Sequence, residues 1–369
     1  MKRNLFTIII WCLLCSCTKA QTIEPQVNEN VELMSILSRL AGFPEYNMNL
    51  AGQYILDINS HFEKHTGHPA VLQMKELRKN HGISYDAVMS MAVHLKVENN
   101  KFTLLPEEEE DTLEKRWANV DQENFLTFLS QFYQDSDFHR FFTEHHKLYQ
   151  KGLLSYKDKV MKKFDQHWYP EFYGKTPEES FSIIIGFGNG GGNYGTERHL
   201  KGQKKEIFAI VGYNVDKAEV PQYSEAYLPT LIHEFNHSFI NYLLDDTVYP
   251  EHVRQLEKSG DILLQSSLWA MSRQAYSNWQ TVINESLVRA AVICYMLDKK
   301  YSVESIRQEL TIQLQRNFRW MPELVQLFRK YQSNRDKYPS LEAFYPEIIC
   351  FFNEYTEDQE NKIKSAISF

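Results

Sequence analysis

The sequence predicts an α+β fold that is predominantly helical, in which a small antiparallel sheet is flanked by N- and C-terminal helical regions. Two long regions, 31–167 and the residues after 215, repeat apolar side chains at the i, i+3, i+4 spacing of amphipathic helices. Between them, the segments 181–188 (FSIIIGFG) and 206–215 (EIFAIVGYNV) are short, rich in β-branched and aromatic residues, and bounded by glycine. This composition is typical of strands.

The N-terminus predicts an export signal that is not part of the fold. Residues 1–17 (MKRNLFTIIIWCLLCSC) begin with a basic pair, continue with an apolar run and end in cysteine. These features are typical of a secretory signal, and the run is too short to cross a bilayer as a helix. Leu14-Cys-Ser-Cys17 resembles a bacterial lipobox, which implies lipidation of Cys17; cleavage after Ala20 is the alternative. We therefore expect an exported bacterial lipoprotein, anchored to a membrane and facing the periplasm or the cell surface.

The rest of the chain divides into three predicted parts. Residues 18–30 are polar and aperiodic, and we expect a tether there. Residues 31–175 form a helical N-terminal region. Residues 176–369 contain the strands and form the expected catalytic region. Its helices are predicted at 229–244, 250–273, 278–298, 302–313, 319–332 and 341–352.

Charge and cysteine content narrow the classes of partner and site. The formal net charge is −8 and the sequence has no basic block, which argues against nucleic acid as a partner. Besides Cys17, the mature chain keeps only Cys294 and Cys350, both in apolar runs. We expect two buried thiols and no cysteine-based metal site.

The segment His233-Glu-Phe-Asn-His237 is the strongest chemical motif. Pro229 suits the first turn of a helix, so both histidines fall on one helix. Side chains four residues apart share a face, with Cβ atoms about 5–6 Å apart, and can reach one metal ion. Glu234 is displaced by about 100° around the axis and is free to act as the base for a metal-bound water. We expect the small sheet to lie beside this helix. A second His pair, His61 and His65, has the same spacing but lacks the glutamate at the second position.

A catalytic zinc site needs a third protein ligand and an open position. Glu285 is the strongest candidate, because a carboxylate within an apolar helix needs a cation or a metal as partner. The alternative is an ion pair between Glu285 and Arg289, one turn later on the same helix.

These residues resemble the gluzincin branch of zinc metallopeptidases, in which HExxH is followed by a downstream helix with Asn-Glu. The resemblance implies that His233, His237 and Glu285 bind Zn²⁺, that Glu234 activates water, and that the substrate is a peptide or protein. Separately, residues 30–47 (NVELMSILSRLAGFPEYN) resemble the opening of an uncharacterised family of exported Bacteroidetes lipoproteins that carry the same motif.

The sequence departs from the gluzincin pattern in two places. Glu285 follows His237 at a longer interval than in thermolysin-like or aminopeptidase-like enzymes. Arg289 stands where an Asp often follows the third ligand by one turn. The third histidine of metzincins is also absent, since HSFINYLL follows the motif.

A glycine-rich connection separates the two predicted strands. Residues 190–195 (GGGNYG) fit G-x-G-x-x-G, but a dinucleotide site needs a helix to begin there, and a polar segment and another strand follow. We expect this loop to lie near the metal cleft and to connect antiparallel strands. The strand 206–215 is predicted to offer backbone groups to an extended peptide. Donors to a developing oxyanion are sought among His199, Tyr242, Tyr276 and Tyr295.

Two functions remain open from the sequence. The first is an exported zinc-dependent hydrolase, specifically a peptidase. The second is a lipid-anchored helical binding protein with a structural or inactive metal site. Glu234 separates the two hypotheses, because a structural site has no use for a carboxylate at that position.

Overall fold

The computed structural model describes residues 23–367, except 49–51, 107–112, 213–222 and 275. The predicted signal sequence, the lipidation at Cys17 and the first part of the predicted tether lie outside the described residues. No helix in the described part of the chain is long and apolar enough to cross a membrane.

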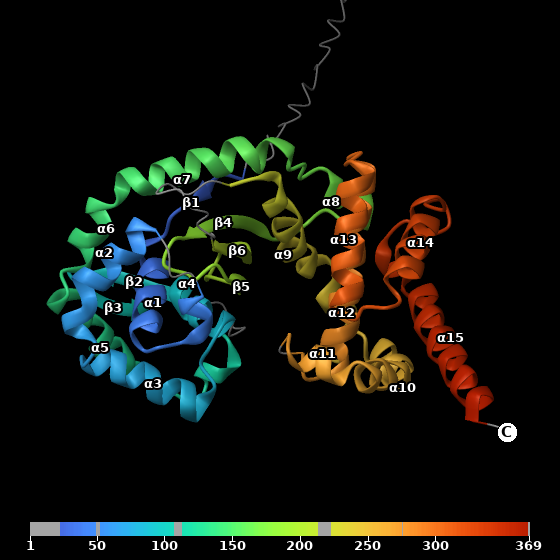
Figure 1. Cartoon of the computed structure of the whole chain (residues 1–369), viewed down its shortest axis with the longest axis horizontal. Helices are drawn as coiled ribbons and strands as arrows, with labels where there is room; N and C mark the ends of the chain where they lie inside the picture. The colour runs from blue at the N-terminus through green and yellow to red at the C-terminus, as the bar shows by residue number, and fades with distance from the viewer. Residues whose placement is uncertain (1–22, 49–51, 107–112, 213–222, 275, 368–369) are drawn as a thin grey trace, which may run out of the picture.

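Helices dominate the structure, and the α+β fold class predicted from the sequence is confirmed (Figure 1). The N-terminal helices are α1 (Glu29–Leu40), α2 (Gln53–Phe62), α3 (Pro69–His81), α4 (Asp86–His94), α5 (Gln122–Asp135), α6 (Phe138–Glu144), α7 (His146–Lys159) and α8 (Trp168–Tyr173). The C-terminal helices are α9 (Leu228–Ile240), α10 (Pro250–Ser266), α11 (Leu268–Ser272), α12 (Trp279–Asp298), α13 (Val303–Gln315), α14 (Met321–Gln332) and α15 (Leu341–Ile367).

Two sheets accompany the helices. One is a small antiparallel hairpin of β2 (Leu95–Glu98) and β3 (Lys101–Leu104) in the N-terminal region. Asn99 and Asn100 between them both have positive φ, as the tight turn of a two-residue hairpin requires. The other sheet has the strand order β1-β4-β6-β5, formed by β1 (Pro25–Gln26), β4 (Ser180–Gly186), β6 (Glu206–Gly212) and β5 (Asn193–Arg198).

The four-stranded sheet lies beside α9, as expected, but it is mixed and not antiparallel. β4 pairs in parallel with both β1 and β6, and only β5 and β6 are antiparallel. The reason is the connection after β4, which contains the additional strand β5. Along the chain, β5 comes next after β4 and lies at the edge of the sheet. β6 follows β5 and lies in the sheet between β4 and β5. β5 was not predicted, because an edge strand of small and charged residues carries little apolar signal.

The predicted tether, 18–30, is partly within the fold. Pro25 and Gln26 form β1 opposite Ile183 and Ile184 of β4, and α1 begins at Glu29. Two residues of edge strand have no alternation from which a strand could be predicted.

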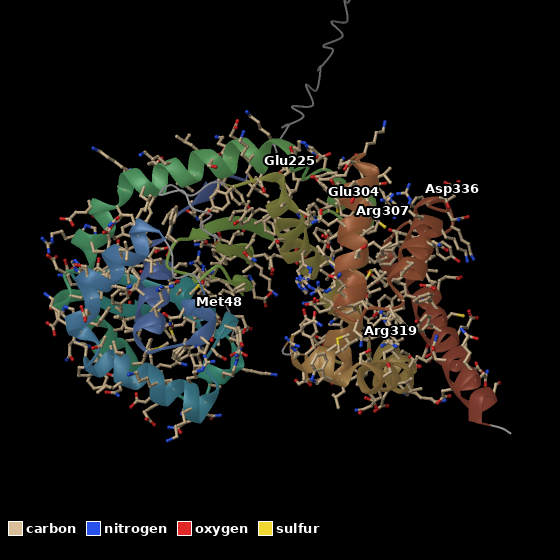
Figure 2. The ribbon with its side chains drawn as sticks, viewed as in Figure 1. Met48, Glu225, Glu304, Arg307, Arg319 and Asp336 are labelled. Atoms are coloured by element: carbon tan, nitrogen blue, oxygen red, sulfur yellow. The ribbon has the colours of Figure 1, made fainter. Side chains whose placement is uncertain are left out.

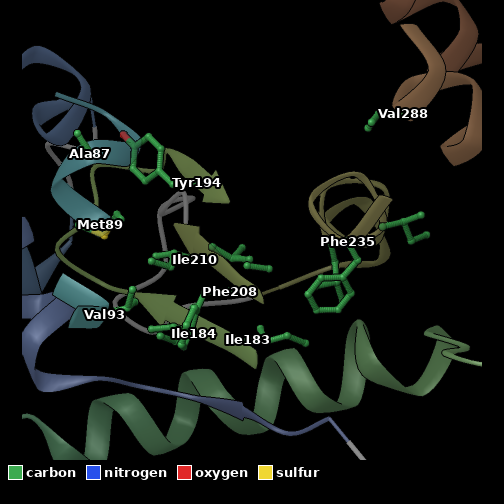
Figure 3. Close-up of a cluster of buried hydrophobic side chains, with 14 of the residues drawn as sticks. Ala87, Met89, Val93, Ile183, Ile184, Tyr194, Phe208, Ile210, Phe235 and Val288 are labelled. Atoms are coloured by element: carbon green, nitrogen blue, oxygen red, sulfur yellow. The ribbon is translucent and has the colours of Figure 1, made fainter. Parts of the chain in front are cut away.

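The sheet and α9 lie between two groups of helices. Figure 1 shows α1–α6 on one side and α10–α15 on the other, with α7 along one side of the sheet. Figure 3 shows the central strands, with Ile184 and Ile210, between Val93 of α4 and Phe235 of α9. These side chains belong to a single buried cluster that includes residues from both helical groups. The predicted boundary at 175/176 therefore divides the sequence but not the core.

Both cysteines of the described chain are free thiols, but only Cys294 is buried as expected. Cys350 is exposed, because it lies on the solvent-facing side of α15, opposite the buried Ile348 and Phe352.

Glu32 of α1 fixes the segment that leads from β4 toward β5. Its fully buried carboxylate accepts hydrogen bonds from the amides of Phe187 and Gly188 at 2.6 and 3.0 Å. It also accepts one from the Tyr54 hydroxyl at 2.7 Å, and Tyr54 is in turn 2.7 Å from the Tyr149 hydroxyl. Burial raises the pKa of Glu32 to about 7, although these hydrogen bonds oppose the increase.

Replacing Glu32 tests this anchor through the pH dependence of stability. The folded-state pKa of about 7 lies above the ordinary 4.5, so wild-type stability falls as pH rises between these values. Glu32→Gln does not titrate. The difference in free energy of unfolding, variant minus wild type, should therefore be about 3 kcal/mol more positive at pH 8 than at pH 4, as measured by urea unfolding. An unchanged difference at the two pH values would contradict the buried, protonatable carboxyl group.

Candidate metal centre

The motif helix α9 forms because one face is apolar and its first turn contains Pro229. The apolar face of α9 is buried, with Phe235 and Phe239 packed against Phe181 of β4 at centroid distances of 4.6 and 6.1 Å. His233 and His237 lie on an adjacent, partly buried face. The sheet and α8 pack against the apolar face of α9. The two imidazoles, on an adjacent face, point toward α12.

α12 is the helix that completes the site. Asn236, fully buried between the two histidines, donates a hydrogen bond from Nδ2 to the carbonyl of Val288 at 3.2 Å. This bond fixes the position of α9 along α12. Glu285, one turn before Val288, consequently lies opposite the histidines, with carboxylate oxygens 3.5 Å from Nε2 of His233 and 3.6 Å from Nε2 of His237.

The donor atoms of His233, His237 and Glu285 lie close enough together to hold one metal ion. The two Nε2 atoms are 3.3 Å apart, and each is 3.5–3.6 Å from a Glu285 oxygen. Tetrahedral ligands at about 2.0–2.1 Å from zinc are separated by about 3.3–3.4 Å. In the part of the chain that the structure describes, these three residues are the group of His, Cys, Asp or Glu side chains placed to hold a metal ion.

The protonation of the imidazoles also suits metal binding. Nδ1 of His237 lies 3.1 Å from Oδ1 of Asn241, an acceptor that keeps the proton on Nδ1 and leaves the Nε2 lone pair free. Burial lowers the pKa of His233 well below its ordinary value, so this ring is neutral. Neutral imidazole is the form that binds metals.

Glu285 makes both of the contacts that the sequence left as alternatives. It faces the histidines, and its Oε2 lies 2.8 Å from Nη2 of Arg289. Burial alone would raise the pKa of Glu285, but the positive charge of Arg289, the largest opposing cause, lowers it to about 2. The carboxylate is therefore ionised and held in place, and Arg289 supports the third ligand position without removing it from the site.

Glu234 lies beside the three donors and is not one of them. Burial raises its pKa to about 7, with the nearby Glu285 adding to the increase. A Cβ atom on Gly195 of β5 would lie 2.7 Å from Oε2 of Glu234. The glutamate of the motif therefore faces the edge of the sheet, and glycine at 195 leaves the space that its carboxylate occupies.

This contact places the end of the glycine-rich segment beside the candidate metal site. It contains no helix N-terminus, since residues 187–192 connect β4 to β5. The two predicted strands that this segment separates, β4 and β6, are parallel, so the expectation that it connects antiparallel strands is wrong; the segment leads into β5, and it is β5 that pairs antiparallel with β6. Glycine is required at 190, where φ is +69° and a Cβ would lie 2.5 Å from the Glu45 carbonyl oxygen.

β5 is the last strand of the four-stranded sheet, and its Gly195 lies beside Glu234 of the candidate site. The amide of Gly212 donates to the carbonyl of Gly192 at 3.0 Å, which sets the alternation of the β5–β6 ladder. By that alternation, Asn193, Gly195 and Glu197 direct their backbone N–H and C=O groups away from β6. The strand predicted to offer backbone groups, 206–215, is wrong for this role, because β6 is paired on both sides.

Of the four residues considered as oxyanion donors, Tyr276 lies at the site. Its hydroxyl accepts a hydrogen bond from Nη2 of Arg289 at 2.8 Å and contributes to lowering the pKa of Glu285. The other three make contacts elsewhere: His199 with the Gln203 carbonyl, Tyr295 with Lys163 and Asp165, and Tyr242 with Lys175 and Tyr249.

The second His pair, His61 and His65, is separate from this site. His61 forms a hydrogen bond with the Ser136 carbonyl at 2.7 Å.

The fold and the site together define a predominantly helical α+β protein with a His-His-Glu group able to hold a metal ion. The family described as "Domain of unknown function (DUF4932)" matches residues 23–351, so the chain belongs to that family. No curated protein and no solved structure matches the chain.

The geometry predicts one high-affinity zinc site per chain. His233→Ala and His237→Ala should each abolish binding, and Glu285→Ala should weaken it by at least about 10-fold, because two imidazoles alone remain. His65→Ala, from the second His pair, serves as the matched control and should bind zinc as wild type does. Binding is measured by competition with a chromophoric chelator on the purified mature chain. Full zinc affinity in His233→Ala would disprove the ligand set.

Proposed function

We propose that the chain is a zinc-dependent hydrolase that cleaves peptide bonds. The observation that carries the proposal is the convergence of His233, His237 and Glu285 to within reach of one metal ion, with Glu234 beside them and outside this group. A purely structural zinc site uses four protein ligands and has no need of a neighbouring base. The alternative, a binding protein with an inactive site, leaves Glu234 unexplained.

Each side chain has a distinct role in the proposed reaction. Zinc held by His233, His237 and Glu285 would supply Lewis-acid activation of a water molecule and of the scissile carbonyl. Oε2 of Glu234 would accept the proton of that water and return it to the leaving amine. Burial raises the pKa of Glu234 in the metal-free chain, and the charge of a bound zinc ion would lower it toward the ionised form that accepts a proton. Arg289 and Tyr276 would hold Glu285 in its ligand orientation.

The edge of β5 supports a peptide as the substrate class. An extended peptide adds to a free sheet edge through main-chain hydrogen bonds. Gly195 combines outward-facing backbone groups with contact to Glu234, so a peptide paired there would pass the base. Together with the predicted N-terminal lipid anchor at Cys17, we propose an exported, membrane-attached peptidase.

The proposal is tested by removing the base while keeping the ligands. Glu234→Gln should keep its zinc and its melting temperature but lose hydrolysis by at least about 10²-fold, as expected for a general base. Cleavage of a mixed peptide library is followed by mass spectrometry, with and without a zinc chelator. Glu63→Gln, in the second His pair, is the control and should cleave at the wild-type rate. Undiminished turnover in Glu234→Gln would exclude the proposed chemistry.

Gly195→Ala tests the position of the base independently. Its methyl group would force the Glu234 carboxylate to move, and a misplacement of about 1 Å costs about 10²-fold in rate. Stability should remain close to wild type, because the displaced atoms are the end of a flexible side chain. Gly67→Ala, where a Cβ meets nothing within 4 Å, is the matched control. Peptidase rates are compared at equal zinc content, and equal rates in the two variants would rule out the close contact.

A further inference from the structure

One turn of the structure places a tyrosine in a backbone conformation that glycine usually adopts. Tyr85, the N-cap of α4, has a φ of 50° and a ψ of −124°. The amide of Ala87 donates a hydrogen bond to the carbonyl of Ser84 at 3.1 Å, which closes a turn around Tyr85 and Asp86. The two dihedral angles are close to those of the second residue of a type II′ turn, where a side chain is strained and glycine is preferred.

Two hydrogen bonds hold Tyr85 in this conformation. Its amide donates to Oε1 of Glu45 at 3.2 Å, and its carbonyl accepts from the Tyr46 hydroxyl at 2.8 Å. Both bonds use backbone atoms of Tyr85, so glycine at this position would keep them. The chain nevertheless carries an aromatic residue here, and Tyr85 is 44% exposed. Strained residues of this kind occur at functional sites, and the exposed ring is the feature that the strain supports.

The turn lies at one end of the contact between α4 and β5. The ring of Tyr46, whose hydroxyl holds the turn, stacks on the ring of Tyr194 of β5 at a centroid distance of 5.6 Å. At the other end of α4, Nη1 of Arg198 in β5 donates to the carbonyl of Val93 at 2.5 Å. α4 therefore lies along β5 with its first residues beside Tyr194, and Figure 3 shows Tyr194 next to Ala87.

The same strand reaches the candidate metal site one residue later. Gly195 follows Tyr194, and a Cβ at Gly195 would lie 2.7 Å from Oε2 of Glu234. Successive side chains of a strand point to opposite faces of the sheet, so Tyr194 marks the α4 face and Gly195 the α9 face. Burial raises the pKa of the Tyr194 hydroxyl, and the nearby Glu45 and Tyr85 add to the increase. Tyr85 thus lies on the α4 face, at the part of β5 whose opposite face meets Glu234.

We propose that Tyr85 selects the substrate by contact with a side chain of an extended peptide that pairs with the outer edge of β5. The proposal rests on the peptidase function proposed above. A peptide strand paired there continues the alternation of the sheet. Its side chain level with Gly195 points to the α9 face, and the side chains before and after it point to the α4 face, where Tyr85 lies. Because an exposed tyrosine ring presents a large apolar surface, the preferred substrates are peptides with an aromatic residue next to the position that passes Glu234.

Binding measurements on the zinc-loaded Glu234→Gln protein test this contact without cleavage. The probes are short fluorescent peptides of alanine and serine, each with one phenylalanine at a different position, together with the parent peptide that has none. At least one phenylalanine peptide should bind about 10-fold more tightly than the parent, since burial of part of an aromatic ring contributes on this scale. Equal binding of all the peptides would overturn the proposal.

Variants assign the preference to its residue. Tyr85→Gly should remove the gain from phenylalanine and leave the affinity for the parent peptide unchanged, whereas Tyr85→Phe keeps the ring and should keep the gain. Tyr85→Gly should also unfold at the same temperature as the parent protein or higher, because glycine relieves the strain of the turn. The matched control is Val303→Ala, which changes another exposed apolar residue and should bind all the peptides as before. Figure 2 shows its neighbour Glu304 on α13, in the C-terminal group of helices.

Two results with the variants would contradict the role of Tyr85. A gain from phenylalanine that survives in Tyr85→Gly would place the contact elsewhere. A clear fall in the melting temperature of Tyr85→Gly, with Tyr85→Phe unchanged, would show that the ring stabilises the fold and is not kept for a peptide.

The outcomes also distinguish this inference from the proposed function. Phenylalanine-dependent binding that requires Tyr85, in a chain that cleaves no peptide when Glu234 is intact, would support the peptide contact and refute the peptidase. Zinc-dependent cleavage at the same rate with and without Tyr85, and with no preference for an aromatic residue, would support the peptidase and refute the role of Tyr85.

Discussion

The contact between α9 and α12 is the constraint on which the site depends. The motif places His233 and His237 on one helix, but a carboxylate from another helix must approach them at one position along the axis. Asn236 fixes that position by its buried hydrogen bond to the Val288 carbonyl. A buried amide that lost this partner would cost about 1–3 kcal/mol, so helix registers that separate the pair are disfavoured. The packing of α9 against the sheet then fixes the direction in which the histidines point.

Electrostatic pairing explains why an ionised glutamate, Glu285, can be buried at the contact between α9 and α12. Burying an ionised carboxylate without a partner is unfavourable by several kcal/mol. Arg289, one turn away on α12, supplies the opposite charge and is itself held by Tyr276 and Gln313. An aspartate at 289 would leave Glu285 without this cation. The departure from the gluzincin pattern is therefore compatible with the same ligand geometry, and it makes the surroundings of the site more positive.

The sequence was sufficient for features that are local in the chain. The apolar spacing of 229–244 and the His spacing predicted the motif helix, and a carboxylate inside the apolar part of helix 278–298 predicted Glu285 at the site. The features that depend on pairing between distant segments were not predictable. β5 has a weak strand pattern, and its place at the sheet edge depends on the order in which β4, β5 and β6 pair. Asn236 and Gly195 carry no signal in isolation, since their importance arises from Val288 and Glu234, which lie far away in the sequence.

The central claim is that the three side chains bind one metal ion together. Zinc-edge anomalous diffraction from crystals of the zinc-loaded mature chain tests it most directly. The account predicts a single site bound by Nε2 of His233, Nε2 of His237 and the carboxylate of Glu285 at about 2.0–2.2 Å, with Glu234 outside the ligand set. A zinc ion bound elsewhere, or Glu285 turned away and paired only with Arg289, would contradict it.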